Sequence, residues 1–434
     1  MARSSASKPD PRTLALDIIE AILVKRRLLD DVFDSDPRLA RLDDRDRAFA
    51  RALVATMLRR LGQIDDLIGR CLEKKLPAKA RRAMDVLRLG VAQLVFLETP
   101  AHAAIDTSVD LVKKTELAGF AKLINAVLRR IDREGRAWAE AQDAGRLNMP
   151  DWLWNSWAAT YGADTARAIA NATLIEAPVD ITVAGDPAGW ADKLEAEALP
   201  TGSLRRRGGG DVTKLPGFSD GAWWVQDMAA ALPARLLGDV AGKRVADLCA
   251  APGGKALQLA VAGGNVTAVD RSARRLRRFT ENLARLKLTS EIVEADVAAW
   301  QPDAPFDRVL LDAPCSATGT LRRHPDGLRL KGPGDVAALA DQQAALLAAA
   351  ARMVAPGGLL VYCVCSLEPE EGIAQVERLL ASGAPFRRLP ITADEVGGLA
   401  ELLTAQGDLR TLPCHLADKG GMDAFYAARL ERLK

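Results

Sequence analysis

Two short segments each place a cysteine after a run of apolar residues. Cys315 lies in Asp312-Ala-Pro-Cys-Ser-Ala-Thr-Gly319, and Cys365 lies in Val361-Tyr-Cys-Val-Cys-Ser-Leu367. If both runs are parallel strands, their carboxyl ends meet at one edge of a sheet, where ligands bind. Two thiols would then lie beside the carboxyl group of Asp312, a combination that favours nucleophilic catalysis.

A cytosine base gives a chemical reason for such a site. Carbon 5 of cytosine is too electron-poor to attack a methyl group directly, but a thiolate that adds to carbon 6 makes carbon 5 nucleophilic. After methyl transfer, the proton on carbon 5 and the thiolate must both leave. Asp312 is suited to bind the ring nitrogen or the exocyclic amine and to stabilise the adduct. The residues alone do not rank the two thiols.

The remaining cysteines have simpler interpretations. Cys363 and Cys365 are two residues apart, so on a strand they share one face and could form half of a metal site. No matching His or Cys pair lies nearby in the sequence, so we predict no metal. Cys363 is expected to be a buried strand residue, and Cys71 and Cys414 are expected to serve packing.

A glycine-rich turn, Asp247-Leu-Cys-Ala-Ala-Pro-Gly-Gly-Lys255, closes one predicted strand and opens a helix. Gly253 and Gly254 permit a tight turn and a close backbone approach to a ligand. An ordinary strand-to-helix turn can look the same, and the dinucleotide fingerprint G-x-G-x-x-G is absent. The predicted cofactor contacts in this turn are Cys249, Ala250, Ala251, Pro252, Gly253, Gly254 and Lys255.

Acidic residues recur at successive strand ends. Asp270 is placed to accept hydrogen bonds from ribose hydroxyls, and Asp296 is placed to contact an adenine amino group. Any one of them is equally well explained as a cap or turn residue, but together with Asp247 they suit a nucleoside cofactor with a positive centre. S-adenosylmethionine carries a sulfonium and an ammonium group, whereas NAD carries a pyrophosphate that prefers an uncluttered helix N-terminus. We therefore predict S-adenosylmethionine.

The elements that must position these groups alternate from about residue 240 onward. Helices are predicted at 255–262, 272–287 and 335–354. This alternation is typical of a doubly wound α/β sheet of parallel strands. The predicted strands are Arg244–Leu248, Asn265–Val269, Glu291–Glu294, Arg308–Leu311 and Leu359–Val364.

The rest of the chain has a different pattern. Residues 11–135 show apolar residues at helical spacing, which predicts an all-α bundle of about seven helices. The following stretch predicts a small α+β connector with helices at 162–175 and 187–198, strands at Asp180–Val183 and Trp223–Val225, and a loop over Thr201–Asp211. The predicted domains are 1–138, 139–235 and 236–434.

Composition sets the outer limits. The chain has 434 residues, enough for two or three domains, and its formal net charge is +2. Six cysteines are too few for a disulfide framework and suggest a reducing, cytoplasmic setting. No secretory signal and no run of about 18 apolar residues occurs, so no membrane span is expected. The small net charge on its own disfavours a nucleic-acid partner, but a whole-chain sum hides local clusters.

These motifs resemble those of the RsmB-like (Fmu/Sun) members of the Nop/Sun RNA cytosine methyltransferase family, over nearly the whole chain. The resemblance implies a Rossmann-like class I methyltransferase domain that uses S-adenosylmethionine, and it places further cofactor positions on Asp270, Asp296 and Asp312. It assigns Cys365 as the nucleophile and Cys315 as the thiol that helps to release the product.

The helical N-terminus is similar to the NusB RNA-binding fold, which implies 16S ribosomal RNA as the substrate, either free or in an assembling subunit. The chain departs from the family pattern at Val364, where Thr is usual, and at Ala317, where Gly is usual. The connector stretch Ile181–Gly185 and the segment Gly421–Tyr426 also differ from the usual sequences. None of these departures removes a reacting group.

Arginine clusters are the candidate RNA contacts. Arg275 belongs to a run on the predicted helix after Asp270, Arg322 and Arg323 follow the proline-cysteine motif, and Arg205–Arg207 form a third cluster. A solvated helix face explains such a run equally well. We predict phosphate contacts from Arg322, Arg323 and Arg275, with the reacting base drawn out of its stack.

A monomer is expected. The sequence leaves alternative functions open: methylation of tRNA or 23S rRNA, a non-catalytic RNA-binding factor, and an NAD-dependent oxidoreductase on the same sheet.

Overall fold

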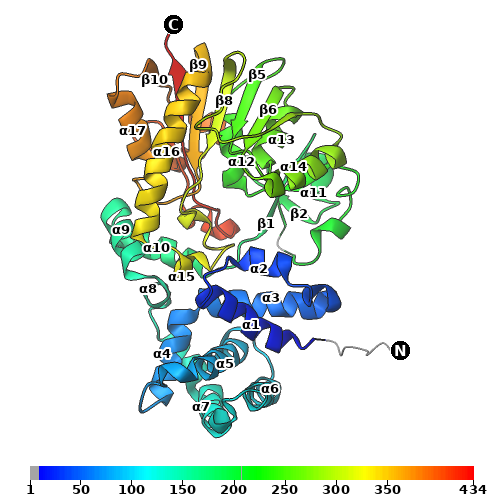
Figure 1. The fold of residues 1–434 in the computed structure, drawn as a ribbon, viewed down its shortest axis with the longest axis vertical. Coiled ribbons are helices and arrows are strands. Elements are labelled where there is room, and N and C mark those ends of the chain that lie inside the picture. The colour runs from blue at the N-terminus through cyan, green and yellow to red at the C-terminus, as the bar shows by residue number, and fades with distance from the viewer. Residues whose placement is uncertain (1–8, 207) are drawn as a thin grey trace. The chain divides into compact units, whose positions relative to one another are not determined.

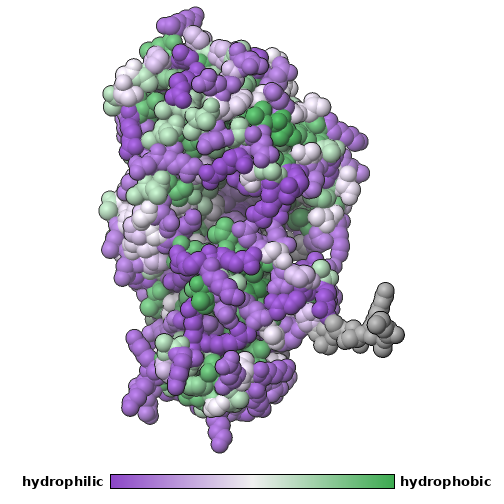
Figure 2. All heavy atoms as spheres, viewed as in Figure 1, coloured by the Kyte–Doolittle hydropathy of each residue, from purple (hydrophilic) through white to green (hydrophobic). Residues whose placement is uncertain are grey.

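The computed structural model describes residues 9–206 and 208–434. They form two compact units, coloured by residue number in Figure 1. The first unit contains the described residues up to Leu174 together with Arg323–Lys331, and the second contains Ile175–Arg322 and Gly332–Lys434. Within these described ranges, no helix is both long and apolar enough to cross a membrane. Hydrophilic residues cover most of the face shown in Figure 2, with apolar residues scattered among them.

The first unit is all-helical, as predicted. Its apolar residues at helical spacing form one buried cluster that runs from Leu14 to Ile131 and also includes Leu330 from the distant segment. Aspartate side chains cap α1 and α3: Asp10 accepts from the backbone N–H groups of Arg12 and Thr13, and Asp43 accepts from that of Asp46. The α-helices are α1 (Pro11–Leu23), α2 (Leu29–Ser35), α3 (Asp44–Arg59), α4 (Leu61–Cys71), α5 (Arg81–Val91), α6 (Ala101–Lys113), α7 (Ala121–Glu140), α8 (Ala144–Asn148), α9 (Asp151–Tyr161), α10 (Ala163–Thr173) and α15 (Gly327–Leu330).

The second unit begins with a small antiparallel sheet in the order β2-β3-β1-β4. Its strands are β1 (Val179–Val183), β2 (Ala196–Ala198), β3 (Leu204–Arg206) and β4 (Trp223–Val225). Two predictions are wrong here: the helix expected over 187–198 is only α11 (Ala188–Ala191) followed by β2, and the loop expected over Thr201–Asp211 contains β3. A long-range contact accounts for β3, because its Arg205 pairs with the buried Asp180 of the neighbouring strand β1.

The large sheet has the order β10-β12-β9-β8-β5-β6-β7, with β11 paired to β12. Five strands are parallel neighbours, as predicted: β5 (Arg244–Leu248), β6 (Asn265–Asp270), β7 (Glu291–Glu294), β8 (Phe306–Asp312) and β9 (Val354–Val364). The sheet is extended by antiparallel strands that were not predicted: β10 (Phe386–Arg388), β11 (Leu409–Arg410) and β12 (Tyr426–Arg432).

Helices cover both faces of this sheet (Figure 1). On one face, α12 (Met228–Arg235), α13 (Gly254–Val261) and α14 (Ala273–Leu286) pack in a cluster with Val245, Leu310 and Val361. On the other face, α16 (Pro333–Met353) and α17 (Ile373–Ala381) pack with their neighbours Ala246, Leu311 and Leu360. Successive strand residues thus point to opposite faces, which is why these strands are apolar throughout.

The predicted three-domain division is finer than the two compact units. Of the connector predicted at 139–235, helices α8, α9 and α10 belong to the first unit, and the small sheet belongs to the second. The boundary that the chain shows here is Leu174, directly after α10.

Candidate active site

The predicted cofactor loop, residues 249–255, connects β5 to α13 at the carboxyl edge of the sheet. Cys249 and Gly253 have φ angles of 62° and 106°, in the left-handed region. A Cβ atom on Gly253 would lie 2.0 Å from Cδ2 of Phe279, so this position has room for glycine alone. The backbone N–H of Ala250 donates to the carbonyl of Val269 at 3.1 Å, which ties the loop to the end of β6.

Asp270 and Arg275 shape this loop from the neighbouring strand and helix. The buried Asp270 carboxylate accepts from the backbone N–H of Ala251 at 3.1 Å and from that of Ser272 at 2.9 Å. Arg275 lies 3.5 Å from Asp270 and donates to the carbonyl of Ala251. Its role as a phosphate contact stays a prediction. Asp296 is exposed in the turn after β7, where it accepts from the N–H of Ala298 at 2.9 Å.

Asp247, Lys255 and Asp312 form a charged group beneath the loop. Lys255 Nζ lies 2.7 Å from Asp312 Oδ2. Burial alone would lower the pKa of Lys255, but the Asp312 carboxylate raises it above its ordinary value. The side chain of Asp312 remains 32% exposed, so a ligand can reach it. The ammonium group of Lys255, one of the predicted cofactor contacts, is therefore already paired within the protein.

Asp247 leaves this group with an excess of acid. It is fully buried, and neither carboxylate oxygen has a hydrogen-bond partner among the residues that the structure describes. Burial and the nearby Asp312 raise its pKa to about 8. At neutral pH the raised pKa keeps most of this carboxyl group protonated, and a nearby ligand with a positive centre, as a sulfonium cofactor has, favours its ionised form.

The structure brings the two predicted thiols together. Cys315 Sγ lies 3.5 Å from Cys365 Sγ, and both residues are partly exposed. The hydrogen bond with Cys365, burial and the nearby Glu371 carboxylate raise the pKa of Cys315. Cys363 is buried in β9 with its Sγ 3.6 Å from Asp312 Oδ1, so the strand interpretation of this residue is confirmed.

Adjacent strands explain this convergence (Figure 1). Asp312 ends β8 opposite Cys363 of β9, and the pairing continues beyond the strands. The N–H of Ala313 donates to the carbonyl of Cys363 and the N–H of Gly319 donates to that of Cys365, both at 3.0 Å. A Cβ atom on Gly319 would lie 2.8 Å from the carbonyl oxygen of Cys365, so glycine at this position allows the two thiol segments to approach closely.

No sequence pattern singled out Glu371, which contacts both thiol segments. Its carboxylate is fully buried and accepts hydrogen bonds from Ser316 and Ser366, the residues that directly follow the two cysteines. The only signal is the acidic run Glu368-Pro-Glu-Glu371 after the second thiol segment. A buried glutamate in such a run is indistinguishable from a solvated one without the tertiary structure.

The predicted arginine contacts need correction. Arg322 is only 1% exposed and donates to the carbonyl of Gly420, so its guanidinium is not a surface phosphate contact. Arg323 is partly exposed and belongs to the first unit. Arg205 is buried against Asp180 at 2.7 Å, Arg206 donates to the carbonyls of Gly208 and Gly209 at 2.9 Å, and Arg207 lies outside the described residues.

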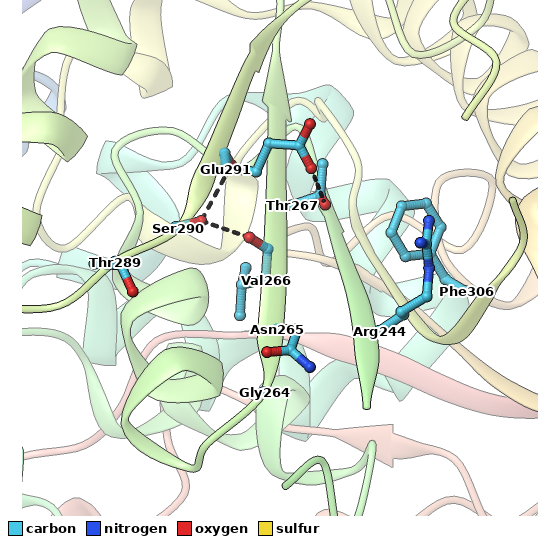
Figure 3. Close-up of a pocket in the computed structure, with 9 residues that line it drawn as sticks. All are labelled: Arg244, Gly264, Asn265, Val266, Thr267, Thr289, Ser290, Glu291 and Phe306. Carbon is cyan, nitrogen blue, oxygen red and sulfur yellow. Dashed lines mark hydrogen bonds between the residues drawn. The ribbon is translucent and has the colours of Figure 1, made fainter. Parts of the chain in front are cut away.

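A cavity of about 360 Å³ opens at the opposite edge of the sheet (Figure 3). It is lined by the first residues of β5, β6, β7 and β8, which are Arg244, Asn265, Glu291 and Phe306. The carboxyl ends that carry the thiols therefore lie at the other edge. Within the described ranges, no group of three or more His, Cys, Asp or Glu residues could hold a metal ion.

Comparisons with known proteins agree with this geometry. Residues 234–431 match the family model described as 16S rRNA methyltransferase RsmB/F, and residues 9–133 match the NusB family. Ribosomal RNA small subunit methyltransferase B of Pseudomonas putida is 35% identical over 443 residues, which cover 98% of this chain and 99% of that protein. The protein of the same name from Vibrio cholerae is 36% identical over 406 residues, which cover 89% and 90%.

Solved structures share the fold. The crystal structure of PH0851 aligns with a TM-score of 0.74 at 22% identity and covers 98% of this chain and 99% of that chain. NSun6 from Pyrococcus horikoshii with SFG aligns with a TM-score of 0.58 at 18% identity and covers 66% and 98%.

The predicted architecture, a NusB-type helical domain followed by a Rossmann-like methyltransferase domain, is therefore confirmed. The cofactor of this class of methyltransferase is S-adenosylmethionine, which the acidic excess around Asp247 fits. Because these relatives are 35% and 36% identical to it over 98% and 89% of its length, the chain belongs to the 16S ribosomal RNA methyltransferase family that includes ribosomal RNA small subunit methyltransferase B.

Proposed function

We propose that this enzyme methylates carbon 5 of a cytosine in 16S ribosomal RNA through a covalent cysteine–cytosine intermediate. The observation that carries the proposal is the pair of thiols 3.5 Å apart at the carboxyl edge, beside the strand that ends at Asp312. Methylation at a nitrogen or a ribose hydroxyl needs no such nucleophile. A pair of thiols suits a reaction in which one must add to the base and later leave it.

The scheme assigns a role to each residue of the site. The Cys365 thiolate adds to carbon 6, and the new bond makes carbon 5 nucleophilic. The loop 249–255, together with Asp270, Asp296 and Asp312, would hold S-adenosylmethionine. When bound, this cofactor supplies the methyl group. Cys315 assists the elimination: its thiol gives a proton to the departing Cys365 sulfur, 3.5 Å away, and its sulfur takes the proton that carbon 5 loses. The bond between sulfur and carbon 6 breaks, and the aromatic ring is restored.

Asp312 serves the base as well as the fold. Its carboxylate is held by Lys255 at 2.7 Å and is partly exposed, so one oxygen can accept a hydrogen bond from the exocyclic amine or from a protonated ring nitrogen. Such a bond stabilises the electron-rich adduct while carbon 6 is bonded to sulfur.

Single substitutions of the two thiols test the proposal. Cys365→Ala should abolish transfer of labelled methyl to 16S rRNA. Cys315→Ala should accumulate a covalent protein–RNA adduct on a denaturing gel, because addition proceeds and elimination fails. Cys71→Ala, which removes a thiol from α4, is the matched control and should keep normal turnover. Normal turnover in Cys365→Ala would overturn the mechanism.

We further propose that the protein acts as a monomer in the cytoplasm on rRNA. Bisulfite sequencing of 16S rRNA, 23S rRNA and tRNA from a strain that lacks the protein should lose one 5-methylcytosine, in 16S rRNA. If the lost 5-methylcytosine lies only in tRNA or 23S rRNA, that RNA is the substrate and 16S rRNA is not. If every modification remains and the purified protein still binds RNA, a non-catalytic RNA-binding factor is favoured. Light scattering of the purified protein tests the monomer.

A further inference from the structure

One buried carboxylate joins the segments that carry the two thiols. Glu371 lies in the turn before α17 and has no exposed surface. Its Oε1 atom accepts from the backbone N–H of Ser316 at 2.8 Å and from Gln343 Nε2 at 3.2 Å. Its Oε2 atom accepts from the hydroxyl groups of Ser316 and Ser366, each at 2.5 Å.

These contacts are arranged for an ionised acceptor. An amide N–H and a side-chain amide donate to one carboxylate oxygen, and two hydroxyl groups donate to the other. A carboxylate accepts at both oxygens, whereas a glutamine side chain would turn its NH₂ group toward two of these donors. We call Glu371 with Ser316, Ser366 and Gln343 the cage. Charge-assisted bonds of this kind are shorter and stronger than neutral ones, so the cage holds its partners firmly.

Further bonds spread this constraint into both segments. Gln343 also donates to the carbonyl of Pro314 at 2.8 Å, one residue before Cys315. The Ser366 hydroxyl accepts from the N–H of Glu368 at 3.0 Å. The Thr318 hydroxyl accepts from the N–H of Leu367 at 3.0 Å, which links the first thiol segment directly to the second.

The cage constrains residues that directly follow the thiols. Ser316 is 2% exposed and Ser366 is fully buried, whereas Cys315 and Cys365 beside them remain partly exposed. The geometry therefore separates a rigid buried layer, Glu371 with its serines, from a reactive layer of thiols above it. The charge of Glu371 also contributes to the raised pKa of Cys315, which keeps that group a thiol beside Cys365.

We propose that Glu371 is a positioning residue that holds Cys315 in register with Cys365, so that the adduct formed by one thiol is resolved with the help of the other. This inference rests on the proposed function. Glu371 touches no reacting atom and acts through Ser316 and Ser366. Without it, addition to carbon 6 and elimination from carbon 5 should slow by different factors.

The primary test compares Glu371→Gln with Glu370→Gln, which removes the same charge from the exposed neighbouring residue. Single-turnover kinetics with labelled RNA give the rates of adduct formation and adduct breakdown separately. In Glu371→Gln we expect breakdown to slow at least tenfold, while KM for RNA and for S-adenosylmethionine stays within twofold of that of Glu370→Gln. Equal breakdown rates in the two variants would overturn the inference.

Two further variants separate the contact of Glu371 with Ser316 from its contact with Ser366. They also replace the primary test if Glu371→Gln does not fold. Ser316→Ala should slow breakdown, because it loosens the Cys315 segment, and Ser366→Ala should slow formation, because it loosens the nucleophile. Added to Glu371→Gln, Ser316→Ala should change breakdown less than twofold, since the contact is already lost. An unchanged breakdown rate in Ser316→Ala, or full multiplication of the two effects, would overturn the inference.

Failure of the underlying function has a different signature. If Cys365→Ala forms product normally, the covalent mechanism fails and the positioning role fails with it. If Cys365→Ala is inactive while Glu371→Gln behaves like Glu370→Gln, the mechanism stands and only the positioning role is wrong.

Discussion

Single residues at the carboxyl edge are held in conformations that are costly for their side chains. Ala317, two residues after Cys315 in the first thiol segment, has a φ of 59°, and Cys249 in the predicted cofactor loop has a φ of 62°. The left-handed region costs an L-residue about 1–2 kcal/mol because its Cβ atom crowds the following carbonyl. The departure from glycine at Ala317 thus has a physical consequence that the sequence motif alone did not show.

Ala317→Gly should stabilise the protein. Removing the Cβ atom relieves the left-handed strain, partly offset by the greater freedom of glycine in the unfolded chain, so the free energy of unfolding should rise by about 1 kcal/mol. Ala348→Gly, in the exposed middle of α16, is the same chemical change in a helical conformation and should lower it by about 1 kcal/mol. Urea titration measures both, and a loss of stability in Ala317→Gly would contradict the explanation.

Asp247 should make stability depend on pH. Its carboxyl group titrates at 3.8 in an ordinary setting and at about 8 in the folded protein, because it is buried beside Asp312. The unfolded chain therefore loses its proton first. This contribution is fully present below about pH 4 and is lost as the pH rises to about 8, by at most about 1.4 kcal/mol per pH unit.

The difference between wild type and Asp247→Asn isolates this effect. Asparagine does not titrate, so the free energy of unfolding of wild type minus that of the variant should fall steadily from pH 4 to pH 8, when both are measured without cofactor. A flat difference for Asp247→Asn would show that this carboxyl group is ionised in the folded state.

At the scale of elements, one buried ion pair organises the small sheet. Arg205 of β3 faces Asp180 of β1, and both side chains are 0% exposed. Arg205 also donates to the carbonyls of Lys419 and Gly421 at 3.1 and 2.6 Å, and Asp180 accepts from the N–H of Met228 at 3.0 Å. The pair therefore joins two strands to the start of α12 and to the loop before β12. An arginine in this role supports structure and is withdrawn from RNA.

Arg205→Ala should be strongly destabilising. It leaves Asp180 as an uncompensated buried charge, so the free energy of unfolding should fall by about 3–5 kcal/mol. The matched control is Arg387→Ala, which breaks an exposed pair with Glu431 across β10 and β12 and should cost less than about 1 kcal/mol. Thermal unfolding measures both, and similar small losses would mean that Asp180 is relieved by another group.

At the scale of the whole molecule, the chain enters the first unit twice. It leaves the second unit after Arg322 and returns at Gly332, and the residues between pack with the helical bundle. Asp326 accepts from the backbone N–H of Leu29 at 3.0 Å, and Arg26 donates to the carbonyls of Arg329 and Leu330 at 2.9 and 2.6 Å. Leu330 joins the helical core, so the helical unit is incomplete without a segment that follows the Cys315 motif.

Asp326→Asn should loosen this attachment in the full-length protein. The buried bond to Leu29 loses its charge, so the local opening free energy at α2 should fall by about 1–3 kcal/mol. Hydrogen exchange of the α2 amide groups should quicken, while that of β5 and β6 stays unchanged. Asp341→Asn, on the exposed face of α16, should leave α2 exchange as in wild type. Unchanged protection of α2 in Asp326→Asn would mean that the bond adds little.

Local patterns predicted a large part of this structure. Helical spacing located the bundle and alternating strands and helices located the five parallel strands, because backbone geometry imposes both periods directly. The antiparallel strands β10, β11 and β12 escaped because they are short or lie beyond the last clear alternation. Arg205 and Arg322 were misassigned to the surface because a charged side chain is buried only where a distant partner receives it.

The sequence predicted the class of fold, a cofactor site at the turn 249–255 and the two candidate thiols, since each depends on residue types at short spacing. Only the tertiary structure decided which charges are buried, that Lys255 is paired with Asp312, and that Glu371 joins the two thiol segments. These facts depend on contacts between residues far apart in the chain, such as the bond from Gln343 to Pro314, 29 residues away. Such contacts form only when the strands have paired in their final order, and no local sequence pattern specifies that order.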